Sequence, residues 1–514
     1  MKFYRKLFIV LASLLVLILL VNVGLNFWIK YQLPQIISEQ NKSPYEITFD
    51  DISVSLVSQN IQATDIIVIP KAPIKDKKKH KGIYARVKKV EVVSFKIWDV
   101  VFNDKISARS LIISDPDLTF YKSKIKEDDD SKTAERMNKI ITVSDLFINN
   151  GRFELVQLES NKRLAYAANI DFNLEGILVT EQTLKQKLPL TYREYTFGCD
   201  SIFYSAGKFY NLRADAFRAT DREASLKNVK VIPRYSRSGF IKAIDKETDL
   251  FAISIDSATI RNMIWGFKNE ELFYSAQSLN LQGLNANIYR NKMVADNTEK
   301  KKLYSEALRN LKFDLKIDTM RIRNSTLAYE EAKNEAGAGK LTFNNFNLTA
   351  TAINSGYKKT KLPNTDIRIN CRLMNAAKLE TEWTFNVMNE AEAFNIKGRI
   401  FDLPLEHMSA FTKPYLNAKT KGIIDRVYFN FSGTDTGVKG DFAIEYDDLK
   451  VEIYRKKDRK KKNKILTAIT NLFVKNDTND EVTTAEVDVE RDQQKSFFNL
   501  VWISIADGMK KILV

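Results

Sequence analysis

The chain has 514 residues, with 80 Lys and Arg against 64 Asp and Glu, and a formal net charge of +16. Its 44% hydrophobic and 28% charged residues are ordinary for a folded protein and exclude a disordered one. With only two His and two Cys, a disulfide framework, a zinc site and most nucleophile–base arrangements lack the residues they need. We therefore expect no enzyme activity, no metal and no cofactor, and we name no catalytic residue.

The first element is an uncharged apolar stretch, residues 7–29, which is long enough to span a hydrocarbon core of roughly 30 Å as a helix. Lys2, Arg5 and Lys6 precede it, which predicts a cytoplasmic N-terminus. The competing interpretation is a cleaved signal peptide, but no clear cleavage site follows the stretch. We expect an uncleaved single-pass anchor at residues 1–30, with the bulk of the chain across the membrane, which in a Gram-negative cell is the periplasm.

Beyond the anchor, apolar and polar residues alternate with a period of two. Ile52, Val54 and Leu56 alternate with serines, and the same pattern recurs at residues 312–317 and 442–446. Such alternation is typical of half-buried, mostly antiparallel strands. The expected fold is mostly β, an elongated and twisted antiparallel β-groove with few helices and a C-terminal amphipathic helix. The predicted helices are too few to cover the apolar face of such a sheet.

An internal repeat organises the strands. TDIIVIPK at 64–71 recurs as KNVKVIPR at 227–234, FINNGRF at 147–153 matches RIRNSTL at 321–327, and residues 172–174 match 346–348. Polar insertions at residues 122–138 and 291–310 interrupt the two copies at corresponding places. Duplicated units of this kind stack on one another rather than forming separate globules. We expect β-groove modules at 31–206 and 207–397, further strands at 398–454, and a basic, tether-like and helical segment at 455–514.

Two basic runs are candidate contacts for anionic lipid headgroups or for the membrane surface. The first, at residues 75–89, includes Lys77, Lys78 and Lys79, and the second, at 455–464, includes Arg459, Lys460 and Lys461. The alternative for the first run is a solvated loop between strands. Nucleic acid is not an expected partner, because a translocated chain would not meet it.

The C-terminal residues 496–514 place apolar side chains at spacings of three and four, which predicts an amphipathic helix. This helix could dock into a membrane, close the far end of the groove or bind a partner; the alternative is an ordinary helix packed on the sheet. Its predicted apolar face consists of Phe498, Val501, Trp502, Ile505, Met509 and Ile512.

Both ends of the folded region resemble one family. Residues 49–71, FDDISVSLVSQNIQATDIIVIPK, are similar to the start of AsmA-like proteins. Residues 398–454 resemble the same family and its TamB-like relatives, with a closing strand pair that carries Gly440, Tyr446, Leu449 and Val451. The resemblance implies a protein of the inner membrane and periplasm whose β-groove carries phospholipid acyl chains and contributes to outer-membrane lipid homeostasis.

The expected partners are a phospholipid or other acyl-chain lipid, the inner membrane, and an outer-membrane or envelope protein. The alternative function is a structural or assembly factor for outer-membrane biogenesis that uses the sheet as a protein-docking platform. Hydrophobicity alone selects the residues expected to line the groove, which are Ile52, Val54, Leu56, Val90, Val92, Phe313, Leu315, Phe442 and Ile444.

Overall fold

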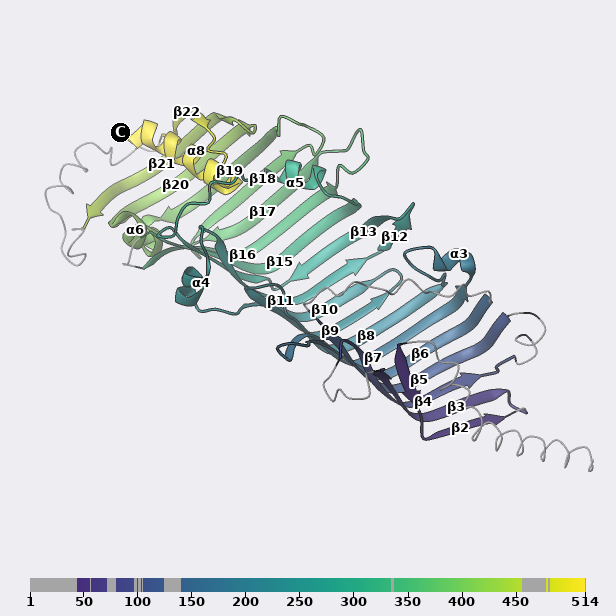
Figure 1. Cartoon of the computed structure of the whole chain (residues 1–514). Coiled ribbons are helices and arrows are strands. Elements are labelled where there is room, and N and C mark those ends of the chain that lie inside the picture. Colours follow the sequence, from purple (N-terminus) through teal and green to yellow (C-terminus); the bar gives the residue numbers. More distant parts are fainter. Residues whose placement is uncertain are drawn as a thin grey trace, which may run out of the picture. The chain divides into compact units, whose positions relative to one another are not determined.

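The computed structural model describes residues 44–55, 57–71, 80–96, 99, 103, 105–123, 140–333, 337–454, 478 and 481–513. The 22 strands in these ranges belong to one large mixed sheet (Figure 1). The predicted mostly β fold with few helices is therefore confirmed for this part of the chain. The anchor predicted at residues 7–29 lies outside the described residues. The chain divides into two compact units, Met1–Ser205 with Leu212–Ala224 and Ala206–Asn211 with Ser225–Val514.

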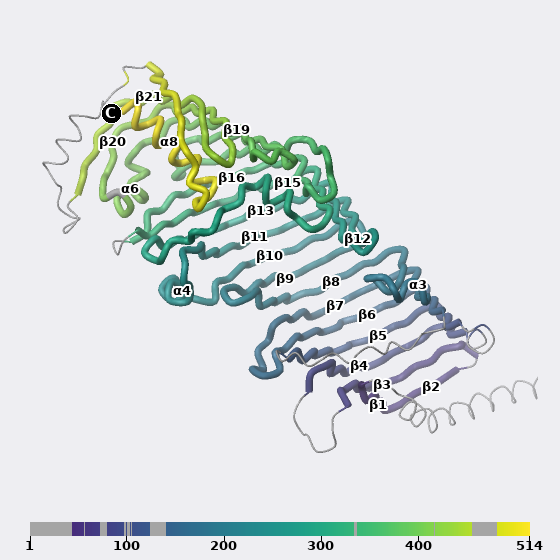
Figure 2. The backbone as a smooth tube through the Cα atoms, turned by 45° about the horizontal axis from the view of Figure 1, so that its top comes forward, coloured from purple at the N-terminus to yellow at the C-terminus, as the bar shows by residue number. Residues whose placement is uncertain are grey.

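The first unit consists of strands laid side by side, as Figure 2 shows for β5 to β8. β3 pairs with β1 and β2 along one edge and with β4 along the other. The only helix of this unit whose bounds are described is the four-residue α3. Its elements are β1 (Tyr45–Thr48), β2 (Asp51–Ser55), β3 (Asn60–Pro70), β4 (Gly82–Val93), β5 (Lys105–Lys122), β6 (Ile140–Gln157), β7 (Lys162–Val179), α3 (Glu181–Leu184), β8 (Glu194–Tyr204) and β9 (Tyr210–Thr220).

The second unit adds helices to the strands. α4 places Phe240 in a small apolar cluster with Leu250, Tyr289 and Ala332, and α6 packs on β16 and β20. Its elements are β10 (Ala224–Pro233), α4 (Arg237–Ala243), β11 (Asp249–Arg261), β12 (Ile264–Lys268), β13 (Glu271–Gln282), β14 (Asn285–Asn291), α5 (Tyr304–Arg309), β15 (Asp314–Ala332), β16 (Ala338–Asn354), β17 (Thr365–Leu373), β18 (Ala377–Phe385), β19 (Phe394–Pro404), the 3-10 helix η1 (Leu405–Met408), α6 (Ser409–Leu416), β20 (Ala418–Gly433), β21 (Gly437–Ile453), β22 (Thr483–Glu490) and α8 (Phe497–Leu513).

Two sequence predictions about the strands need correction. The sheet is not purely antiparallel, because β6 pairs in parallel with β5, and β15 pairs in parallel with both β13 and β14. These parallel pairs follow the polar insertions that interrupt the two sequence copies, and a parallel connection needs a long crossover. The C-terminal segment 398–454 is not made of strands only, since η1 and α6 separate β19 from β20.

Many strands of the sheet contain a residue with positive φ. In β5 this residue is Asp115 (φ 49°), and in β6 it is Asn150 (φ 54°). The Asn150 side chain donates a 2.6 Å hydrogen bond to Asp115, and its backbone amide donates one of 3.0 Å to Asp171. Asp and Asn tolerate the left-handed conformation better than other side chains. These acidic and amide residues are therefore the local cause of the irregularity.

The left-handed residue shifts the alternation along each strand. A β-bulge interrupts the β6–β7 pairing between Ile148 and Gly151. A Cβ atom at Gly151 would lie 3.4 Å from Ile148 and 3.3 Å from Pro116, so this position and Ile148 face the same side although they are three positions apart. Phe153, two residues beyond Gly151, continues on that side. Apolar side chains before and after the bulge thus share one face.

The left-handed residues fall at matching places in the two sequence copies. The pairs are Asp65 with Asn228, Asp115 with Gly283, Asn150 with Asn324, and Asn169 with Asn345. Their agreement supports the duplication inferred from the sequence.

One sequence match shifts by two residues in the structure. Ile148 pairs with Phe172, whereas its counterpart Ile322 pairs with Leu348. Residues 172–174 therefore correspond structurally to 348–350 rather than to 346–348.

Candidate functional site

The first unit carries two neighbouring rows of apolar side chains that cross its strands. Residues directly opposite each other in paired strands point to the same face, so the strand register defines each row. Row A consists of Val54, Ile61, Val92, Leu111, Leu146 and Leu174. Row B consists of Ile52, Ala63, Val90, Ile113, Ile148, Phe172 and Phe197.

Four residues selected from the sequence lie in these rows. Val54 and Val92 flank Ile61 in row A, while Ile52 and Val90 flank Ala63 in row B. The structure therefore brings together residues from β2 and β4 that are far apart in the sequence. Leu56, which was selected with them, lies outside the described residues. The sequence analysis missed the members from β5 to β8, because the left-handed residues break the alternation there.

Rows A and B are apolar but only partly buried. At the β2 end, Ile52 and Val54 are buried, whereas Leu111, Ile113, Leu146 and Ile148 keep intermediate exposure. Both clusters of buried apolar side chains found in the described part of the chain belong to the second unit. Since α3 is the only helix of the first unit with described bounds, no described second layer covers these two rows. An apolar surface of this kind suits a hydrophobic ligand.

The second unit repeats the arrangement with one difference. Rows C and D again lie two residues apart along each strand, and their burial increases toward the C-terminal strands. Row C consists of Leu279, Met320, Ala350, Ile367, Trp383, Ile396 and Phe431. Row D consists of Leu281, Ile322, Leu348, Ile369, Thr381, Gly398, Phe429 and Phe442.

The remaining groove candidates fall at different places in the second unit. Phe442 ends row D and Ile444 lies two residues farther along β21, and both are buried in the main hydrophobic core. Leu315 stands at the start of β15 opposite Tyr274, and Phe313 precedes that strand. These two half-buried residues do not belong to rows C or D.

The helix expected at the C-terminus is α8, which packs on β21 and β22 (Figure 1). Its buried residues are Phe497, Leu500, Ser504, Gly508 and Ile512. Of the face selected from the sequence, Val501, Ile505 and Met509 pack at the margin of this contact and Ile512 lies within it. Phe498 and Trp502 are 60% and 44% exposed.

Two small residues explain why the buried face differs from the one selected by hydrophobicity. Ser504 is fully buried, and a Cβ atom on Gly508 would lie 2.4 Å from the ring of Phe442. Small side chains at these positions let α8 approach the sheet closely. A selection that counts only large apolar residues cannot detect such a contact.

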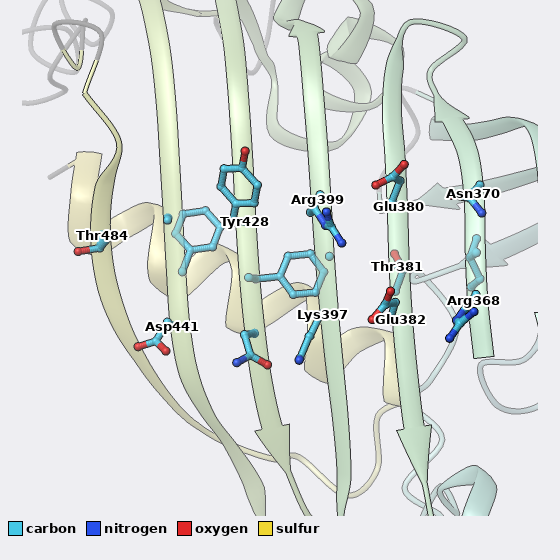
Figure 3. Close-up of a pocket in the computed structure, with 16 residues that line it drawn as sticks. Arg368, Asn370, Glu380, Thr381, Glu382, Lys397, Arg399, Tyr428, Asp441 and Thr484 are labelled. Atoms are coloured by element: carbon cyan, nitrogen blue, oxygen red, sulfur yellow. The ribbon is translucent and has the colours of Figure 1, made fainter. Parts of the chain in front are cut away.

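A separate hollow of about 560 Å³ lies over β17 to β22 (Figure 3). Its polar lining includes Tyr428 and Asp441, which neighbour the buried Phe429 and Phe442 and therefore point to the face opposite α8. Charges of opposite sign stand across from each other there, with Glu382 between Arg368 and Lys397. The opposite charges offset one another on this face. The hollow is adjacent to row D, since Ile369, Thr381, Gly398, Phe429 and Phe442 also contribute to its lining.

Both cysteines of the chain lie in the described residues and are buried. Burial raises the pKa of the Cys371 thiol to about 12 and also raises that of Cys199, so both stay protonated at neutral pH. No group of His, Cys, Asp and Glu in the described ranges could hold a metal ion.

The basic candidates Lys77, Lys78, Lys79, Arg459, Lys460 and Lys461 lie outside the described residues. Among the helices that the structure describes, none is both long and apolar enough to cross a membrane. No protein-family model matches this chain, and no curated protein is significantly similar to it.

Proposed function

We propose that this protein binds acyl-chain lipids along its apolar rows and shields their hydrocarbon from water. The observation that carries the proposal is the pair of rows A and B, which is continuous over the strands from β2 to β7 and lacks a described covering layer. A soluble domain normally buries such a face against helices or a second sheet. A hydrocarbon ligand would supply the missing cover.

The dimensions of the rows suit acyl chains. Row B crosses seven strands, and at about 4.8 Å per strand it extends for about 29 Å. One leaflet of a bilayer contributes about half of the roughly 30 Å hydrocarbon core. The row is therefore long enough for about two acyl chains end to end.

The free energy gained by burying an acyl chain on these rows is also large enough to support binding. Removing one CH₂ group from water is worth about 0.8 kcal/mol, so a 16-carbon chain that buries half of its surface gains about 6 kcal/mol. Because the rows lie side by side on one face, a chain can slide along them without losing contact. This supports passive conduction of lipid as well as binding.

The cellular setting belongs to the same proposal. Together with the resemblance to AsmA-like proteins, an anchor at residues 7–29 would place the apolar rows in the periplasm of a Gram-negative cell, between the inner and outer membranes. The protein would then take phospholipid from the inner membrane and contribute to outer-membrane lipid homeostasis.

The test compares adjacent residues of β5. Ile113→Asp places a charge in row B, whereas Ser114→Asp places the same charge on the opposite face of the same strand. Full-length protein would be purified in mild detergent, and bound lipid would be measured by native mass spectrometry. We expect lipid with the wild type and with Ser114→Asp, and loss of lipid with Ile113→Asp at an unchanged melting temperature.

The opposite results would reject the proposal. A lipid-free wild type that carries a stoichiometric protein partner would favour a protein-docking platform. Equal lipid loss from both variants would show that the lipid does not lie on rows A and B.

A further inference from the structure

Rows C and D are open at one end and covered at the other. On β13, β15 and β17 their members keep intermediate exposure, for example Leu281, Ile322 and Ile369. On β16, Leu348 also keeps intermediate exposure, whereas the small Ala350 of row C is buried. On β20 and β21 the same rows reach Phe431 and Phe442, whose side chains are fully buried. The change occurs where α8 packs on the sheet. The face is therefore the same one throughout, with α8 as its cover at the C-terminal end.

An aromatic cluster marks the point where the cover begins. Trp383 of row C stacks on Phe497 at the start of α8, with ring centroids 4.5 Å apart. Tyr304 of α5 meets the Trp383 ring edge-on at 5.2 Å, and Phe498 lies 6.3 Å from Tyr304. Trp383 is nine-tenths buried beneath these rings. A chain that followed row C from β13 would meet this cluster before it reached β19.

The segment that leads into α8 is held at several points. The Arg491 guanidinium, 1% exposed, pairs with Asp435 and donates to the backbone oxygen of Lys301. The Lys301 amide donates to the backbone oxygen of Gln493 at 2.8 Å. At the other end of α8, Lys511 donates to the backbone oxygen of Glu486 at 2.9 Å. Polar contacts at both ends thus reinforce the apolar contact of the helix.

We infer that α8 is a fixed end-stop for lipid on rows C and D. Acyl chains occupy these rows from β13 to β17 and halt at Trp383, and the part of the face beneath α8 stays sealed. The inference rests on the proposed function and adds that lipid does not leave the second unit over β19 to β22. The occupant of the sealed part is α8 itself, whose apolar residues take the place of hydrocarbon there.

The experiment maps where lipid contacts the full-length protein. A phospholipid with a photoreactive diazirine in its acyl chain would be incorporated and irradiated, and labelled residues would be identified by peptide mass spectrometry. We expect label at Ile322 and Leu348 and none at Phe429 or Phe442. Labelling of all four residues to the same extent would overturn the end-stop and leave the proposed function intact. No label at any of them would reject lipid binding by this unit, and the end-stop with it.

Variants of α8 test whether the helix itself closes the face. Gly508→Leu introduces a side chain against Phe442 and should displace α8, so that label appears at Phe429 and Phe442. Ala506→Leu adds the same side chain on the exposed side of α8 and should leave the labelling unchanged. Leu500→Ala loosens the same contact without a steric clash, which covers the case in which Gly508→Leu does not fold. If α8 loses its protection from hydrogen exchange and the covered residues still take no label, the end-stop inference is wrong.

Discussion

Leu500 and Phe498 lie two positions apart on α8, and truncation of each to alanine should have very different consequences. Leu500 is 1% exposed and belongs to the main hydrophobic core, whereas Phe498 is 60% exposed. Truncating a fully buried leucine removes its transfer energy and leaves a cavity, which costs about 2–5 kcal/mol. The larger Phe498 side chain contributes mainly edge contacts with Tyr304 and Phe497. Its truncation should cost less than about 1 kcal/mol.

Hydrogen exchange measured by mass spectrometry reads this difference locally. Peptides from 497–513 report the opening of α8, and every 1.4 kcal/mol of lost stability raises the exchange rate about tenfold. Leu500→Ala should therefore accelerate exchange in α8 by roughly 30-fold or more, and Phe498→Ala by less than about fivefold. Peptides from β5 and β6, in the other unit, serve as the internal reference.

The reverse ranking would refute this assignment of the buried face. If Phe498→Ala accelerated exchange more than Leu500→Ala, α8 would pack through the face selected from the sequence. The covered part of rows C and D would then need another explanation.

Three further predictions concern other parts of the chain. Asn150→Val puts a β-branched residue at φ 54° and should cost about 1–3 kcal/mol in urea unfolding, whereas Asn150→Gly loses only the exposed hydrogen bond to Asp115 and should cost less; equal stability of the two would show that the left-handed conformation is not required. Since burial raises the pKa of Cys371 to about 12, its alkylation at pH 8 should be on the order of a thousandfold slower in the folded chain than in urea, and equal rates would contradict the burial. Burial opposes ionisation of Glu330, but hydrogen bonds from Arg237 and Asn287 outweigh it and lower the pKa of Glu330, so this stabilisation is present above the unfolded pKa of about 4.3 and is lost as the pH falls through the folded value. Glu330→Gln should thus reduce the loss of unfolding free energy at acid pH. If the dependence of stability on pH in acid is unchanged, other carboxylates cause the loss.

The sequence predicted the parts of this fold that depend on simple periodicity. Alternation around Ile52, Val54, Val90 and Val92 identified strands whose register places these residues in rows A and B. The duplication predicted which strands correspond, because segments such as TDIIVIPK and KNVKVIPR recur in the same order in both copies. In both cases the signal is local in the sequence, and the pairing of neighbouring strands follows from it.

Features that depend on a shift in the strand alternation, or on contacts between residues far apart in the sequence, could not be predicted in this way. Asp115 shifts the alternation in β5, so Leu111 and Ile113 are followed by Leu118 and Phe120 on the same face, and Asn150 shifts the alternation in β6. Such a shift resembles the end of a strand when the sequence is read alone. The parallel pairing of β5 with β6 depends on a crossover, and a polar insertion does not reveal its direction.

The depth of the α8 contact was hidden for a different reason. Ser504 and Gly508 have no hydrophobic signal, yet they occupy the centre of the buried face because they are small. An Asp or Asn within a strand, and a pair of small residues four apart in an amphipathic helix, are the signals that would have improved the prediction.

The central claim, that lipid lies on the apolar face of the first unit, can be tested most directly with two adjacent residues of β6. Leu146 belongs to row A, and Phe147 points to the opposite face of the same strand. Each would be replaced in turn by photoreactive benzoylphenylalanine in the full-length protein, which would be irradiated in the presence of radiolabelled phospholipid. We predict strong crosslinking from position 146 and background crosslinking from position 147. Equal crosslinking from both positions, or crosslinking from position 147 only, would contradict the claim.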